Sequence, residues 1–244
     1  DLVIVLFKDE LASIIDNGSL TNEAHIFMRD WRDSRQFGAM YKQWAEMLEV
    51  ELGVMQQIQD EPIERLVRVE TFPCVDKVIA KYLHKEVKNE TITTEKVESI
   101  VDDRRNKIFF GVAQHTINAM LEARRLFEDI EKKMAGLSIT SADEGFKMYV
   151  NDLYIIDQHY RHFFHEAKLA ESTNLVNDII PKVEQTYTNK FLSVLANKWQ
   201  PIVDAMDKWQ ITGVSTQRSF FSTHVSPFTQ KGKRIFVIIS DALR

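Results

Sequence analysis

Residues 97–135, VESIVDDRRNKIFFGVAQHTINAMLEARRLFEDIEKKMA, decide the fold class, because their apolar side chains recur at helical spacing. These apolar positions are Ile100, Ile108, Phe109, Val112, Ile117, Met120, Leu121, Leu126, Phe127 and Ile130. A stripe with this period covers one face of an α-helix, and Gly136 follows it as a natural helix end. The pattern predicts a long amphipathic helix over residues 97–135.

The same helical period recurs along most of the chain, which predicts a mainly α fold. We expect helical segments over residues 21–52, 66–83, 141–164 and 175–199, with Gly38 bending or breaking the first of them. Glycine and proline are scarce, with eight and five residues among 244, and this scarcity favours long helices over a turn-rich β protein.

Three segments depart from the helical pattern. Residues 2–7, LVIVLF, fit either a buried strand or the start of a helix. Residues 209–233 are rich in Ser, Thr, Gly and Pro, and we interpret them as a connector. Residues 234–244, RIFVIISDALR, contain an apolar run typical of a central parallel strand covered on both faces. We therefore divide the chain into a helical region, residues 1–208, this connector and a strand.

The composition indicates a globular protein of an intracellular type. Hydrophobic residues make up 44% and charged residues 27% of the chain, and no apolar run approaches the roughly 20 residues of a membrane span. The net charge of −5 gives no overall basic field to attract nucleic acid or an anionic membrane. The single cysteine, Cys74, fits a reducing compartment. We expect a cytoplasmic location and no membrane partner.

Two arginine pairs are the candidate nucleic-acid contacts, namely Arg104 with Arg105 and Arg124 with Arg125. Basic side chains on one helix can meet phosphates. Acidic residues are interleaved with these arginines, however, which is typical of a solvated helix face with intrahelical ion pairs. We favour that interpretation and keep nucleic-acid binding as the alternative.

Three histidines, His159, His162 and His165, form an HxxHxxH pattern on a predicted helix. Two of them could bind a metal, but the chain contains neither a Glu-x-x-His nor an HExxH motif. Aromatic and basic neighbours favour helix packing with an exposed rim.

Asp241 follows the predicted strand directly. Ligands of parallel sheets bind beyond the carboxyl ends of the strands, so a carboxylate there suits a metal or a phosphate-bearing substrate. The alternative is a structural aspartate that caps the next helix. A lone strand leaves its backbone groups unpaired, so it pairs either with residues 2–7 or with strands beyond Arg244.

The segment KGKRIFVIISDALR, residues 231–244, resembles the opening of the PglZ domain, which belongs to the alkaline-phosphatase superfamily. Residues 27–38 (FMRDWRDSRQFG), 154–164 (YIIDQHYRHFF) and 217–225 (QRSFFSTHV) are similar to the helical region before that domain in PglZ proteins of the bacterial Pgl and BREX phage-defence systems. The resemblance implies that residues 234–244 are the first strand of an α/β alkaline-phosphatase-like domain, and that the chain is a segment of a longer protein.

The resemblance also implies a chemistry for the longer protein. Asp241 would be the first metal ligand of a two-metal phosphohydrolase site, with zinc as the metal. The nucleophile and the remaining ligands would lie downstream. Because zinc requires about four ligands, we expect these 244 residues alone to bind no catalytic metal and to hydrolyse nothing.

The expected partners are other BREX or Pgl proteins, such as a DNA methyltransferase, together with DNA contacted through the longer protein. Two alternatives remain open. In one, the chain is a non-catalytic helical adaptor that closes with a sheet between residues 2–7 and 235–239. In the other, the arginine pairs make the helices a DNA-binding module.

Overall fold

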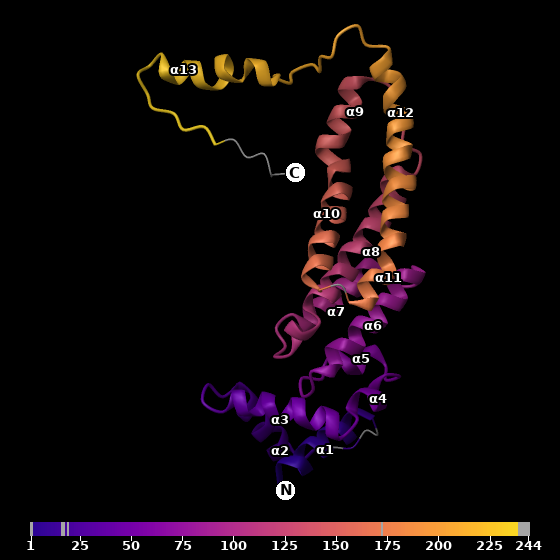
Figure 1. The fold of residues 1–244 in the computed structure, drawn as a ribbon, viewed down its shortest axis with the longest axis vertical. Helices are drawn as coiled ribbons and strands as arrows, with labels where there is room; N and C mark the ends of the chain where they lie inside the picture. The colour runs from indigo at the N-terminus through magenta and orange to yellow at the C-terminus, as the bar shows by residue number, and fades with distance from the viewer. Residues whose placement is uncertain (1, 16–17, 19, 172, 239–244) are drawn as a thin grey trace.

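The computed structural model describes residues 2–15, 18, 20–171 and 173–238. The described chain is helical, with no strand within these ranges, so the predicted mainly α class is confirmed. The molecule is elongated (Figure 1). Helices α1–α5 lie at one end, α6–α8 occupy the middle, and two long helical segments run to the other end, from which the C-terminal residues project.

The N-terminal end is built from short helices, α1 Leu2–Ile15, α2 Asn22–Asp33, α3 Gly38–Glu51, α4 Val54–Ile58 and α5 Ile63–Leu66. Residues 2–7 are therefore helical. Leu6, Phe7, Leu11 and Ile14 are buried on one face of α1, which accounts for the apolar run. The alternative in which residues 2–7 pair with residues 235–239 in a sheet is wrong.

An aromatic cluster holds this end together. Phe7 lies 6.2 Å from Trp31, 5.5 Å from Tyr41 and 5.8 Å from Phe72, measured between ring centroids. Such edge and tilted contacts add about 0.5–1.5 kcal/mol per pair beyond area burial. The predicted helical segment 21–52 breaks between Asp33 and Gly38, so the break predicted near Gly38 is confirmed. A Cβ at Gly38 would lie 2.9 Å from the Arg32 carbonyl oxygen, so this close approach requires glycine.

The middle contains α6 Cys74–Asn89, α7 Thr94–Arg104, the 3₁₀ turn η1 Phe110–Val112 and α8 Gln114–Met134. The predicted continuous helix 97–135 is thus two helices. A tight turn ends the first, with the Lys107 N–H bonded to the Arg104 carbonyl at 2.8 Å. Phe109 and Phe110 are buried in this turn, and the buried Phe109 therefore matched the spacing of the predicted helical stripe. The predicted helix 66–83 likewise begins only at Cys74, after an irregular segment.

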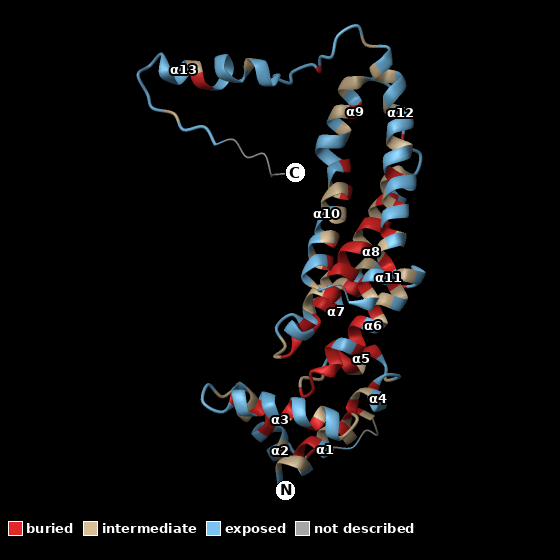
Figure 2. Ribbon diagram, viewed as in Figure 1, coloured by how far each residue is buried: buried red, intermediate tan, exposed pale blue. Residues whose placement is uncertain are grey.

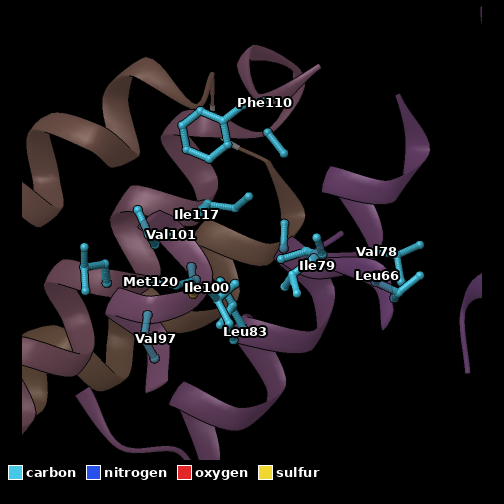
Figure 3. Close-up of a cluster of buried hydrophobic side chains, with 14 of the residues drawn as sticks. Leu66, Val78, Ile79, Leu83, Val97, Ile100, Val101, Phe110, Ile117 and Met120 are labelled. Atoms are coloured by element: carbon cyan, nitrogen blue, oxygen red, sulfur yellow. The ribbon is translucent and has the colours of Figure 1, made fainter. Parts of the chain in front are cut away.

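The main core lies where α5, α6, α7 and α8 meet (Figure 3). Leu83, Val97, Ile100, Ile117 and Met120 are all buried there. Each such side chain contributes about 1.5–3 kcal/mol through burial of apolar surface. Helix α8 packs against α6, α7, α10 and α11 and is the central element of the molecule.

Two long segments extend from this core. The first comprises α9 Ala142–Met148, the π-helical η2 Tyr149–Leu153 and α10 Tyr154–Leu169, and the second α11 Asn174–Thr186, the π-helical η3 Tyr187–Leu192 and α12 Ser193–Asp204. Ser141 caps α9 as predicted, because its hydroxyl accepts from the Glu144 N–H at 3.2 Å. No described helix combines the length and the apolar character that membrane spanning requires.

The predicted connector, residues 209–233, contains the short elements η4 Gln217–Ser219, η5 Phe221–Val225 and α13 Ser226–Thr229. Residues 234–238, the described part of the predicted strand, have no regular secondary structure. Buried residues concentrate in the middle of the molecule, while the far end and residues 209–238 are mostly exposed (Figure 2).

Candidate functional site

Arg104, the first of the predicted phosphate contacts, lies in the core. Its side chain is fully buried, and its Nε and Nη2 each donate to an Asp76 carboxylate oxygen at 2.8 Å. Its Nη1 donates to the Val67 carbonyl at 3.2 Å and to the Val69 carbonyl. The guanidinium donors are occupied inside the protein, so Arg104 cannot meet a phosphate unless the core opens.

Arg105 and Arg124 differ in their surroundings. Arg105 is exposed and pairs with Asp102 at 3.0 Å, as the interpretation of a solvated, ion-paired face predicts. Arg124 is largely buried, and its Nε donates to the Ile92 carbonyl at 2.8 Å. Its Nη2 lies 3.9 Å from Glu128, and its Nη1 is buried without a hydrogen-bond partner among the described residues. Arg124 is therefore also directed into the protein.

Arg125 bridges two acids on different helices. Its Nε and Nη2 donate to Glu98 on α7 at 3.0 and 2.6 Å, and its Nη1 donates to Glu122 on α8 at 2.9 Å. These contacts fix α7 against α8. The four arginines predicted as nucleic-acid contacts thus form no shared basic face.

A row of polar side chains joins α8 to α10, and we name it the α8–α10 ladder: His115, Glu122 and Asp129 from α8, with His159, His162 and Glu166 from α10. The α8 residues are seven positions apart and the α10 residues three and four positions apart, so each set lies on one side of its helix.

Histidine and carboxylate pairs alternate along this ladder. His115 Nδ1 lies 2.8 Å from Glu166 Oε2 at one end. His159 Nδ1 lies 2.7 Å from Glu122 Oε2, while its Nε2 lies 3.4 Å from Asp129 Oδ2. The imidazole of His159 is thus held between two carboxylates. These contacts fit the predicted helix-packing role of the HxxHxxH pattern.

Glu122 is the ladder carboxylate with the most basic neighbours, since it contacts Arg125, His159 and His162. Burial alone would raise its pKa, but the hydrogen bond and charge of His159 and the charge of Arg125 outweigh burial. The pKa of Glu122 is therefore lowered from its usual range. An ionised Glu122 is the form that accepts hydrogen bonds from both neighbours.

A tyrosine–aspartate cluster connects the two long segments. Tyr187, the first residue of η3, donates its hydroxyl to Asp157 at 2.5 Å, and Tyr149, the first residue of η2, donates to the same carboxylate. Tyr160 stacks on Tyr187 with ring centroids 3.8 Å apart. Single π-helical turns often occur at functional sites. Here, both π-helical turns place a tyrosine at one shared acceptor.

The tyrosines of this cluster are suited to donate hydrogen bonds. Burial and the hydrogen bond to Asp157 raise the pKa of Tyr149 to about 12, and the same two causes raise the pKa of Tyr187. Both phenols therefore stay protonated near neutral pH. They hold the two segments together and do not act as bases.

A metal site is not found in the described part of the chain, where no three His, Cys, Asp or Glu side chains are arranged to hold an ion. The ladder carboxylates already face histidines and arginines. The described residues therefore do not fit the two-metal centre that the resemblance implies for the longer protein. Asp241, its predicted first ligand, lies outside the described residues.

Sequence reasoning missed the partner of Arg104. Asp76 is fully buried in α6 beside Val75 and Ile79, on the apolar face of that helix. A carboxylate among apolar positions is itself a signal for a buried cationic partner, because an unpaired buried charge costs several kcal/mol. The identity of that partner depended on how α6 and α7 meet.

Comparison with known proteins finds two similar curated sequences. The chain is 29% identical over 223 residues to an alkaline phosphatase-like protein PglZ of Bacillus cereus, and 28% identical over 233 residues to an alkaline phosphatase-like protein BrxZ of Escherichia coli. Each match covers 91% of this chain but only 26% and 27% of the relatives, so the chain spans about a quarter of their length. No family model and no solved structure matches. The predicted resemblance is thus confirmed, because over 91% of its length the chain is similar to alkaline phosphatase-like proteins named PglZ and BrxZ.

Proposed function

We propose that this chain is the helical scaffold of a longer PglZ-type phosphohydrolase that acts in bacterial phage defence. One observation carries the proposal: the similarity extends over 91% of the chain to two proteins named alkaline phosphatase-like, each about four times as long as the matched part. The helices would position the catalytic domain, and the 244 residues alone would be inactive.

In this proposal, Asp241 is the first ligand of a two-metal zinc site whose remaining parts lie downstream. Two metals of this kind stabilise the attacking and leaving oxygens of a phosphoester. The reaction class would be hydrolysis of a phosphoester or phosphodiester. The longer protein would work in the cytoplasm, in keeping with its lone and buried Cys74 in this segment.

The test is hydrolysis of a chromogenic phosphodiester by the longer natural protein with and without Asp241→Ala. We expect the substitution to abolish turnover and to lower the zinc content. Asp207→Ala is the matched control, since Asp207 is an exposed aspartate outside the predicted strand. Full activity of the Asp241→Ala variant would refute the assigned role.

The helical region would also bind partner proteins, such as a DNA methyltransferase of the same defence system. Exposed apolar side chains on α2, on α3 and in the turn between them support this role: Ile26, Phe27, Phe37, Met40, Met47 and Val50. Methionine and aromatic residues suit protein interfaces because they bury much surface and adapt to a partner.

Point substitutions test this role better than deletion of residues 21–208, which would expose the buried face of α1. We expect Phe27→Ser combined with Met47→Ser to abolish partner co-purification with the longer protein. Leu192→Ser is the control, because Leu192 is equally exposed but lies on η3 at a distance from α3 along the bundle. Undiminished co-purification would exclude the α2–α3 surface.

A further inference from the structure

Residues 217–229 form a helical segment with an uncovered apolar side. The elements η4, η5 and α13 follow one another, with Phe220 in helical conformation between the first two. Phe221, Val225 and Phe228 recur at intervals of four and three residues, which places them on one side of the segment. Phe221 and Phe228 are exposed, and only Val225 is buried. An amphipathic helix of this kind normally packs its apolar side on another element.

A helix-ending motif directs the chain from this helix into the extended residues. The Lys233 N–H donates to the Phe228 carbonyl at 3.0 Å, and the Gly232 N–H donates to the Thr229 carbonyl at 3.0 Å. Gly232 adopts a left-handed conformation with φ of 67°. This pair of bonds is the Schellman motif, in which glycine tolerates the positive φ. The helix and the extended segment are therefore joined by a defined turn.

The extended residues that follow are uncovered on both sides. Phe236 and Ile238 are 89% and 92% exposed, and Val237 between them is 46% exposed. Within the described residues, no backbone hydrogen bond involves residues 234–238. A segment with apolar side chains and unpaired backbone groups has the properties of a strand that lacks its sheet.

An open hollow of about 550 Å³ lies between the helix and the extended residues, lined in part by Phe220, His224, Val237 and Ile238. Phe220 of the helical segment and Val237 and Ile238 of the extended residues thus line a shared space, whereas Phe221, Val225 and Phe228 do not line it. In layered α/β folds, a helix and the adjacent strand bury such side chains together with neighbouring strands.

We propose that residues 217–238 form one helix-and-strand unit of the α/β domain that follows in the longer protein. The extended residues pair as a strand in the sheet of that domain, and the helix packs on an apolar face of the same sheet. This inference rests on the proposed function, because it requires the longer chain. The relatives supply the argument for this occupant, since about three quarters of their length lies outside the match.

The charge of residues 217–238 indicates what kind of surface the following domain presents to them. No acidic residue occurs between residues 209 and 240, whereas Arg218, Lys231, Lys233 and Arg234 are basic. A sheet face with an acidic rim is complementary to this unit. Under this proposal the connector comprises only residues 205–216, between the end of α12 and the start of η4, instead of the predicted residues 209–233. The catalytic domain of the longer protein would then begin at the helical segment, before the predicted strand.

Hydrogen exchange on the longer natural protein and on the 244-residue chain tests the proposal. We expect amides of residues 217–238 to exchange at least about 100-fold more slowly in the longer protein, because a covered strand and helix open far less often. Amides of α8 provide the internal control, since α8 lies in the helical core of this chain, away from residues 217–238.

Three outcomes would overturn the proposal. The first is equally fast exchange of residues 217–238 in both proteins. The second is concentration-dependent protection in the 244-residue chain together with dimer formation in sedimentation, which would make a second copy the occupant. The third is a natural product that ends at Arg244. Phosphodiester hydrolysis is measured separately, so a protein that protects this unit but hydrolyses nothing refutes only the proposed activity.

Discussion

Arg104 and Arg105 are neighbours in sequence with opposite environments. Arg104 is fully buried against Asp76, whereas Arg105 is exposed beside Asp102. A buried pair is expensive to break because removal of one partner leaves an uncompensated charge. An exposed pair contributes little because water screens it.

The first prediction compares these two arginines by urea unfolding at pH 7. Arg104→Leu lowers the free energy of unfolding by about 3–5 kcal/mol, because Asp76 then remains charged and buried. Arg105→Leu changes it by less than about 1 kcal/mol. Equal effects of the two substitutions would contradict the buried pair.

The second prediction concerns the pH dependence of Glu122. Because the pKa of this carboxyl is lower in the folded chain, ionised Glu122 stabilises the fold. Its contribution to the free energy of unfolding is fully present above the unfolded pKa of about 4.5. That contribution is lost as the pH falls through the folded pKa. Glu122→Gln lowers the free energy of unfolding by about 1.5–3 kcal/mol at pH 7, and the gap to the wild type closes below about pH 4.5.

Urea unfolding from pH 7 to pH 3 measures this gap. Glu131→Gln is the control, because Glu131 lies on the same helix but is exposed. A gap that persists unchanged at pH 3 would show that the α8–α10 ladder does not depend on ionised Glu122.

At the scale of elements, Gly145 sets how closely α9 and α12 approach. A Cβ at this position would lie 2.4 Å from the Trp199 ring and 2.8 Å from the Ile139 side chain. Trp199 in turn packs edge-on against Trp209, with ring centroids 6.1 Å apart. The glycine is therefore required by packing, although alanine would be the better helix former.

The third prediction follows from this contact. Gly145→Ala lowers the free energy of unfolding by about 1–3 kcal/mol, because the indole must shift to make room. Gly111→Ala is the matched control, with no atom within 4 Å of the added Cβ. Adding Trp199→Leu to Gly145→Ala should recover part of the loss, and an unchanged loss in the double variant would place the strain elsewhere.

Local sequence signals predicted some helix boundaries correctly and others wrongly. Ser141 and Gly38 marked helix boundaries correctly, because a side-chain cap and a missing Cβ are local requirements. Residues 105–113 were assigned to a helix wrongly, since Phe109 is buried in a turn and still matches a helical stripe. Local patterns reveal burial but do not reveal which geometry achieves it.

At the scale of the whole molecule, the charge distribution gives little support to DNA binding. The net charge is −5, and of the four predicted arginines only Arg105 is mainly exposed. The fourth prediction is that Arg105→Glu leaves the affinity for duplex DNA and its salt dependence unchanged. Fluorescence anisotropy at two salt concentrations measures both, and a salt slope reduced by about one would identify a phosphate contact at Arg105.

The sequence by itself determined the mainly α class, the helix boundaries set by caps and glycines, and the resemblance to PglZ proteins. Each of these depends on residues close together in the chain. Only the tertiary structure decided that residues 2–7 are helical, that Arg104 is buried against Asp76, and that Glu122 lies against His159. The two side-chain pairs join residues that are far apart in the sequence, by 28 positions for Arg104 and Asp76 and by 37 for Glu122 and His159. The conformation of residues 2–7 depends on which surface their apolar side chains pack against. Periodicity reports that a face is buried, whereas packing selects the surface against which it is buried.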